Sequence, residues 1–137
     1  MFQSNQSHQY VYQIISFLLL SILSLGLSAN VTTMPQQTLL DNMASNIPML
    51  ILDVRTPEEY AEGHVPNAIN IPHTEIKQQA SLIAQAENEG KQIVVYCRSG
   101  RRAGYAESVL QSSGIQSLHH LEGDMNAWTE NQHPIEH

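Results

Sequence analysis

The sequence predicts an α/β domain in three layers, with a central parallel sheet flanked by helices. Two observations lead to this prediction. Short apolar runs, Met49–Val54 and Ile93–Tyr96, have the composition of strands covered on both faces. Segments with apolar residues at helical spacing lie between and around these runs. Strands that alternate with helices are typically parallel, because each connection crosses over one face of the sheet.

The first helix is expected to begin near Pro35, which is at a first-turn position, and to carry an apolar face as far as Ile47 before Pro48 ends it. Met49–Val54 follows as a buried strand. The next helix is expected to be short. It starts at Thr56-Pro57-Glu58-Glu59, which supplies an N-cap, a first-turn proline and a capping-box glutamate, and Gly63 follows closely.

The remaining elements continue the alternation of strands and helices. They are a strand at Ala68–Ile71, a helix from Ile76 to near Gly90, a central strand at Ile93–Tyr96, a helix from Ala103 to Gly114, a weaker strand at Ser117–Leu121, and a last helix capped by Asp124 that holds Met125 and Trp128.

Residues 1–29 contain no Lys, Arg, Asp or Glu. Ile14–Leu27 is an apolar run that ends in small residues, which is typical of a signal peptide cleaved after Ala29. This interpretation predicts an exported, periplasmic protein whose single domain spans residues 30–137. The alternative is an uncleaved inner-membrane anchor at residues 11–29, because about 20 apolar residues span a bilayer.

The 137 residues include 13 Asp plus Glu against 6 Lys plus Arg, and one cysteine, Cys97. The acidic balance argues against nucleic-acid binding, which needs an extended basic surface. A single cysteine excludes an intramolecular disulfide and any site built from several cysteines. Half of the basic residues, Arg98, Arg101 and Arg102, follow this cysteine within five positions. The pattern indicates a local cationic pocket around one thiol, suited to a small anion.

Cys97 directly follows a predicted buried strand and precedes a predicted helix. The carboxyl ends of parallel strands are where open α/β sheets bind ligands. Gly100 is free to take a positive φ, which lets the loop curl so that several backbone N–H groups face one point. These N–H groups, the helix dipole and the guanidinium groups are expected to hold an anion above the sulfur and to favour the thiolate.

Three separated blocks of the sequence resemble the rhodanese family of sulfurtransferases, specifically its small exported single-domain members. They are LDVRTPEEYAEGHVPNAINIP at residues 52–72, YCRSGRRA at residues 96–103 and LEGDMNAW at residues 121–128. The resemblance implies a rhodanese-like fold. It also implies that Cys97 takes a sulfane sulfur from a small anionic donor such as thiosulfate, becomes a persulfide, and passes the sulfur to cyanide or a thiol.

The resemblance also implies the roles of the surrounding residues. Catalysis is expected to need no metal or organic cofactor, the protein is expected to act as a monomer, and it contacts a membrane only if the amino-terminal segment stays uncleaved. Arg98 and Arg102 are expected to attract the donor, and Arg101 either joins them or points to solvent. The loop N–H groups that cradle the anion belong to Arg98, Ser99, Gly100, Arg101 and Arg102, and an internal network of Asp53, Arg55 and Glu59 supports the loop.

The length of the loop favours sulfur transfer over phosphate chemistry. Related phosphatases and arsenate reductases of the same fold have a loop one residue longer, with an arginine six positions after the cysteine. Here Arg102 lies five positions after Cys97, and position 103 is Ala. An open alternative is a sulfur-carrier or redox-sensing module, in which Cys97 works with a partner protein and does not turn over.

Several other polar residues are interpreted as structural. His64 is expected to hydrogen-bond within a turn, and Asn67 to take the left-handed conformation there. His119 and His120 adjoin a predicted strand and point to opposite faces, so they cannot both bind one metal ion.

Overall fold

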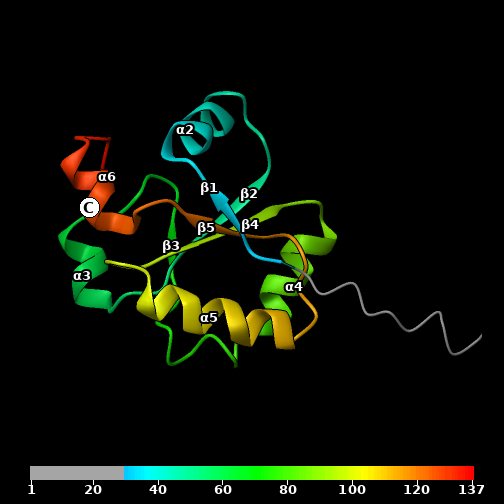
Figure 1. Ribbon diagram of the computed structural model, residues 1–137. Helices are drawn as coiled ribbons and strands as arrows, with labels where there is room; N and C mark the ends of the chain where they lie inside the picture. The colour runs from blue at the N-terminus through cyan, green and yellow to red at the C-terminus, as the bar shows by residue number, and fades with distance from the viewer. Residues whose placement is uncertain (1–29) are drawn as a thin grey trace, which may run out of the picture.

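The computed structural model describes residues 30–137 as a five-stranded parallel sheet covered by helices on both faces (Figure 1). The strand order is β1-β5-β4-β2-β3, and each pairing is parallel. This confirms the three-layer α/β prediction. The strands are β1 (Thr32–Met34), β2 (Met49–Asp53), β3 (Ile69–Asn70), β4 (Gln92–Tyr96) and β5 (Leu118–Leu121).

β4 is the central strand, as its composition predicted. Its apolar residues alternate between two buried clusters, so that Ile93 and Val95 pack on one face and Val94 and Tyr96 on the other. Five residue pairs join β4 to β2, and three join it to β5. Because the strands are parallel, their carboxyl ends meet at one edge of the sheet, and the segments that follow β2, β4 and β5 lie near one another there.

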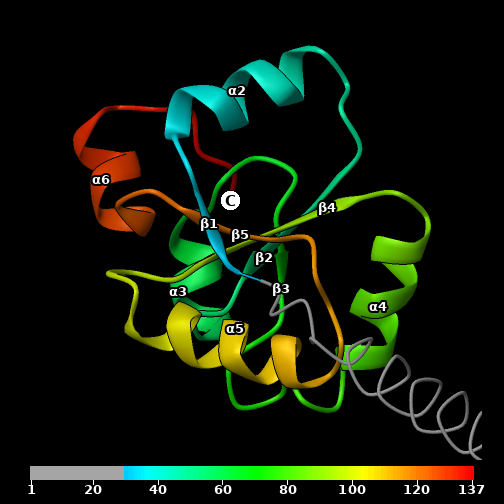
Figure 2. The ribbon, with the colours of Figure 1, turned by 45° about the vertical axis from the view of Figure 1, so that its right-hand side comes forward.

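The helices divide between the two faces. Helices α4 (Ala80–Asn88) and α5 (Arg101–Ser112) cover one face, and α2 (Gln36–Ala44) and α6 (Asp124–Glu130) cover the other, as Figure 2 shows. The short helix α3 (Pro57–Glu62) adds Tyr60 to the second cluster. Both faces of the sheet are therefore shielded, as expected for near-continuous apolar strands.

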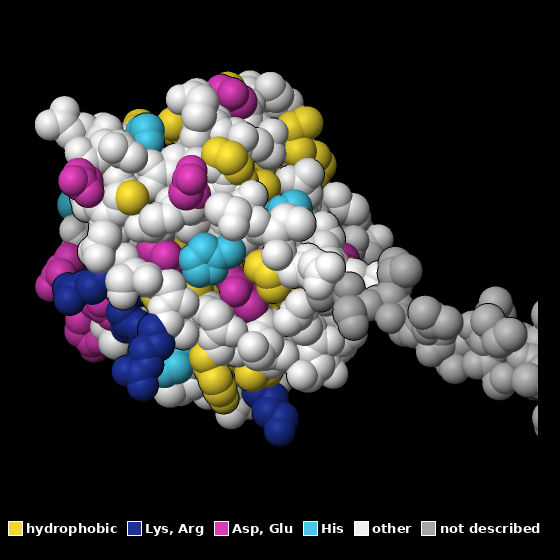
Figure 3. Space-filling view, viewed as in Figure 1, with side chains coloured by type: hydrophobic (Ala, Val, Ile, Leu, Met, Phe, Trp, Pro, Cys, Tyr) yellow, Lys and Arg dark blue, Asp and Glu magenta, His cyan; other side chains and the backbone are white. Residues whose placement is uncertain are grey.

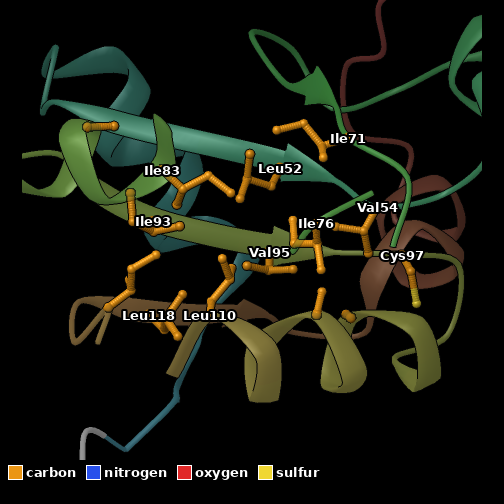
Figure 4. Close-up of a cluster of buried hydrophobic side chains, with 14 residues drawn as sticks. Leu52, Val54, Ile71, Ile76, Ile83, Ile93, Val95, Cys97, Leu110 and Leu118 are labelled. Carbon is orange, nitrogen blue, oxygen red and sulfur yellow. The ribbon is translucent and has the colours of Figure 1, made fainter. Parts of the chain in front are cut away.

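The buried apolar cluster under α4 and α5 includes Cys97. Figure 4 shows Cys97 at the end of this cluster, beyond Val95 and near Val54 and Ile76. Apolar packing therefore fixes the backbone immediately before the loop, while the loop itself lies outside the core.

The capping box of α3 is present as predicted, with Thr56 Oγ1 accepting from the Glu59 N–H and the Glu59 carboxylate accepting from the Thr56 N–H. Gly63 ends the helix. Asn67 has φ 63°, which confirms its left-handed conformation. His64 Nδ1 lies 2.9 Å from the Tyr60 carbonyl oxygen, which confirms its hydrogen bond within the turn.

Several predicted boundaries were wrong. α2 ends at Ala44, because the chain turns at Asn46 with φ 54°, and Ile47 is 40% exposed rather than on the helix face. Ile76 is fully buried but lies in turns before α4, so its apolar character reflects burial and not helix. β1 was not predicted, because three residues are too few to show an alternating pattern.

No helix within residues 30–137 has both the length and the apolar character needed to cross a bilayer. The signal peptide or anchor expected at residues 1–29 lies outside the described residues.

Candidate functional site

Cys97 lies where β4 ends, and its side chain is almost fully buried. The Gly100 N–H donates a hydrogen bond to Sγ at 3.0 Å. Gly100 has φ 104° and is the N-cap of α5, so the loop curls back over the sulfur with a conformation that L side chains rarely adopt. The expected positive φ at this glycine is confirmed.

A cavity of about 580 Å³ opens above the sulfur. It lies at the end of the molecule where Figure 3 shows Lys and Arg side chains gathered beside Asp and Glu. Three lining residues, His73, Thr74 and Tyr105, were not identified from the sequence. Tyr105 lies four positions after Arg101 on α5, on the same side of the helix, and this spacing could have revealed it. The cavity is lined by His73, Thr74, Cys97, Arg98, Ser99, Arg101, Arg102 and Tyr105.

The three arginines differ in their charge partners. Arg102 makes a bidentate pair with Glu59, through hydrogen bonds of 2.6 and 2.9 Å. This pair lowers the pKa of Glu59 to about 2. Arg98 is 65% exposed, and its Nε lies 3.7 Å from the same carboxylate. Arg101 is exposed and also lines the cavity, and among residues 30–137 it is the one of the three arginines without a carboxylate partner.

Asp53 and Arg55 form the expected internal pair. The Arg55 guanidinium donates to the fully buried Asp53 carboxylate at 2.6 Å and to the Gly63 carbonyl at 2.8 Å. The Tyr96 hydroxyl also donates to Asp53, and burial together with this carboxylate raises the Tyr96 pKa. This group ties the ends of β2 and β4 to the chain after α3. It does not line the cavity, and Glu59 belongs instead to the arginine pair.

The first turn of α6 holds the other side of the loop. Asp124 Oδ1 accepts from the Cys97 N–H at 2.8 Å, and the Met125 N–H donates to the Cys97 carbonyl at 3.0 Å. The Asn126 N–H donates to the Arg98 carbonyl at 3.1 Å. The prediction that Asp124 caps α6 was wrong: the N-cap is Gly123, and the Asp124 carboxylate binds the cysteine loop instead.

His120, which the sequence did not single out for the site, bridges two carboxylates. Its Nε2 lies 3.0 Å from Asp124 Oδ2, and its Nδ1 lies 2.6 Å from Glu107 Oε1. The hydrogen bonds to Asp124 and then Glu107 raise the pKa of His120 to about 10, so the ring is an imidazolium at neutral pH. His119 instead contacts Thr32 Oγ1, so the two histidines have separate partners as expected. No group of three or more His, Cys, Asp or Glu in residues 30–137 is arranged to hold a metal ion.

The fold and the site define the class of parallel α/β domains that present a cysteine from the loop after the central strand. The chain belongs to the rhodanese-like domain family, whose model matches residues 36–131.

Individual relatives agree with this assignment. A sulfurtransferase from Allochromatium vinosum is 31% identical over 105 residues, covering 77% of this chain and 94% of that protein. The thiosulfate sulfurtransferase PspE of Escherichia coli is 36% identical over 72 residues, covering 53% of this chain and 67% of that protein. An uncharacterized protein of Synechocystis, slr1261, is 35% identical over 99 residues, covering 72% of this chain but only 52% of that protein. The chain therefore spans about half the length of that relative.

A solved structure extends the similarity to three dimensions. The rhodanese-related protein of Thermoplasma volcanium superposes with a TM-score of 0.65 at 27% identity, covering 77% of this chain and 97% of that one.

Proposed function

We propose that this protein is a sulfurtransferase that moves a sulfane sulfur from thiosulfate, or a similar small anionic donor, to a thiophilic acceptor. The Cys97 thiolate attacks the outer sulfur of thiosulfate. A sulfur–sulfur bond forms to Cys97, the original sulfur–sulfur bond breaks, and sulfite leaves with the bonding electrons. Cyanide or a thiolate then attacks the terminal sulfur of the persulfide, and the Cys97 thiolate leaves.

The observation that supports this proposal is that Cys97 lines a cavity together with three arginines, Arg98, Arg101 and Arg102. The Gly100 N–H already points at the sulfur. Backbone N–H groups and a helix N-terminus stabilise negative charge, whether on the thiolate or on the persulfide that replaces it. Two of the named relatives, from Allochromatium and Escherichia coli, are sulfurtransferases.

In this proposal, Arg101 is the main side chain that attracts the negatively charged donor. Arg102 pairs with Glu59 and also interacts with Cys97, whereas Arg101 has no carboxylate partner within residues 30–137. We propose that the enzyme works as a monomer, because the cysteine and the three arginines lie within one short segment of one small domain.

The test is steady-state production of thiocyanate from thiosulfate and cyanide. The wild-type protein is expected to turn over many times per chain, and Cys97→Ser is expected to fall to the background rate because no persulfide can form. One persulfide per chain without turnover would contradict the enzyme and support the sulfur-carrier alternative. Activity that survives in Cys97→Ser would contradict both.

Two alanine variants test the binding of the donor, one at Arg101 in the cavity and one at Lys91 as its control. Arg101→Ala is expected to raise the KM for thiosulfate by about three- to tenfold, the effect of losing roughly 1 kcal/mol of charge interaction in a solvated site. Lys91→Ala removes the same charge from the turn before β4, at the opposite end of that strand, and is the matched control. Equal KM values for the two variants would contradict the role of Arg101.

A further inference from the structure

Three charged side chains from three elements form a hydrogen-bonded group against the cysteine loop. His120 on β5 lies between Glu107 on α5 and Asp124 on α6. Glu107 is 7% exposed and Asp124 is 3% exposed, so water screens their charges poorly. Asp124 joins this group to the backbone of Cys97, whose N–H donates to its carboxylate.

The group contains two carboxylates and one imidazolium. No other titratable side chain is paired with His120 on the neighbouring strands, since the residues opposite it are Thr33 on β1 and Val95 on β4. The two carboxylates hold the ring in its charged form over the neutral range of pH. With His120 charged, the group carries one net negative charge, and with a neutral side chain at position 120 it would carry two.

This charge lies next to the reactive sulfur. Asp124 Oδ1 accepts from the Cys97 N–H, and a Cβ placed on Gly100 would lie 3.2 Å from Asp124 Oδ2. Gly100 is also the residue whose N–H donates to Sγ. A carboxylate in this position holds the loop by hydrogen bonding, but its charge opposes a thiolate and repels an anionic donor.

We propose that His120 is a positioning residue for the Cys97 thiolate. It holds the Asp124 carboxylate against the loop and offsets the negative charge of Asp124 and of Glu107. The role in sulfur transfer rests on the proposed function, whereas the effect on the reactivity of the thiolate does not.

The test is the pH dependence of alkylation of Cys97 by iodoacetamide, measured on the full-length chain by mass spectrometry. The site of alkylation is unambiguous because the chain has one cysteine. His120→Gln keeps a hydrogen-bonding side chain but removes the charge. We expect its alkylation midpoint to move to higher pH by roughly 0.5–1 unit, because a nearby negative charge disfavours the thiolate.

Removing a carboxylate is expected to have the opposite effect. Asp124→Asn retains an oxygen that can accept from the Cys97 N–H but loses the charge, so its midpoint moves to lower pH. The double variant His120→Gln/Asp124→Asn is expected to return close to the wild-type midpoint. His119→Gln is the matched control: it changes the adjacent histidine, whose partner is Thr32 on the edge strand, and leaves the profile unchanged.

Circular dichroism of each variant distinguishes a shifted thiolate from a lost fold. If His120→Gln does not fold, Glu107→Gln serves as the second measurement, because it removes one negative charge without touching the Asp124 contact to Cys97 and should shift the midpoint to lower pH. Identical profiles for His120→Gln and His119→Gln, or shifts of the same sign for His120→Gln and Asp124→Asn, would overturn the proposal. Alkylation needs no sulfur donor, so a chain that shows these shifts but makes no thiocyanate would refute the proposed function and leave the role of His120 intact.

Discussion

At the scale of single residues, Glu59 connects the cap of α3 to Arg102, the last arginine after Cys97. Its carboxylate accepts from the Thr56 N–H and also receives two hydrogen bonds from the Arg102 guanidinium. The cysteine loop is therefore tied to α3 by one side chain, and this link should contribute to stability in a pH-dependent way.

Glu59→Gln is expected to lower the free energy of unfolding by about 1–3 kcal/mol at neutral pH, because the pair with Arg102 is partly buried. The pKa of Glu59 in the folded protein is about 2, below the ordinary value of 4.5. Its contribution is therefore present in full above pH 4.5 and is lost as the pH falls toward 2. Urea unfolding at pH 7 and at about pH 2.5 measures whether the stabilities of wild type and variant become equal at low pH.

Glu89→Gln is the control, because Glu89 pairs with Lys91 on the exposed surface at 3.4 Å and should change stability by less than about 0.5 kcal/mol. A stability difference between wild type and Glu59→Gln that stays constant from pH 7 to pH 2.5 would argue against the ion pair as its source.

Some residues of the site could be predicted from the sequence, and others could not. Cys97 and the three arginines lie within six consecutive residues, so their local pattern was enough to find them. Asp124 meets Cys97 across 27 residues of sequence, and its position before a helical stripe is equally typical of an N-cap. His120 gains its partners only when α5 and α6 pack against β5, which no local pattern encodes.

At the scale of elements, the start of α5 depends on the conformation of Gly100. The residue caps the helix in a left-handed conformation, and its N–H reaches the sulfur. A side chain at position 100 would disturb both the cap and the hydrogen bond, because its Cβ would lie 3.2 Å from the Asp124 carboxylate.

Gly100→Ala is expected to lose about 1–2 kcal/mol of stability, the cost of a left-handed conformation for an L residue, and to lower the rate of thiocyanate formation as the N–H turns away from Sγ. Gly104→Ala lies one turn later in the same helix, where a Cβ meets no atom within 4 Å. It should raise stability by about 0.5–1 kcal/mol without reducing the rate. Thermal unfolding and the cyanide assay measure both effects, and a Gly100→Ala protein as active as Gly104→Ala would contradict this account of the loop.

The elements that were predicted well are those whose sequence signals are local and strong. β4 reads as a continuous apolar run, and the capping box of α3 lies within four consecutive residues. β1 was missed because it has three residues, so tertiary pairing and not local pattern defines it. The strand predicted at Ala68–Ile71 is present as β3, although only two of its residues are paired. The segment before α4 is apolar because Ile76 fills the core from a turn.

At the scale of the whole molecule, the position of the first described strand bears on the predicted cleavage site. β1 starts at Thr32, three residues after Ala29, and pairs with β5. Cleavage after Ala29 would therefore leave all five strands of residues 30–137 in the mature chain. We propose that the domain is exported and works in the periplasm, with retention by an uncleaved anchor as the competing outcome.

Amino-terminal sequencing of the protein recovered from the periplasmic fraction is expected to begin near Asn30. Recovery of the intact amino terminus in the membrane fraction would instead support the anchor at residues 11–29. A full-length chain found only in the cytosol would contradict both.

The strand order also sets a limit on when the domain can finish folding. Within residues 30–137, β1 is synthesised first and pairs only with β5, so Thr32 cannot pair with His119 until the chain has been made as far as β5. Contacts this distant in sequence form late and slowly. A nascent chain of this topology thus lacks the pairing of its edge strand until almost the whole polypeptide has been made, which under the proposed export would favour translocation before the sheet is complete.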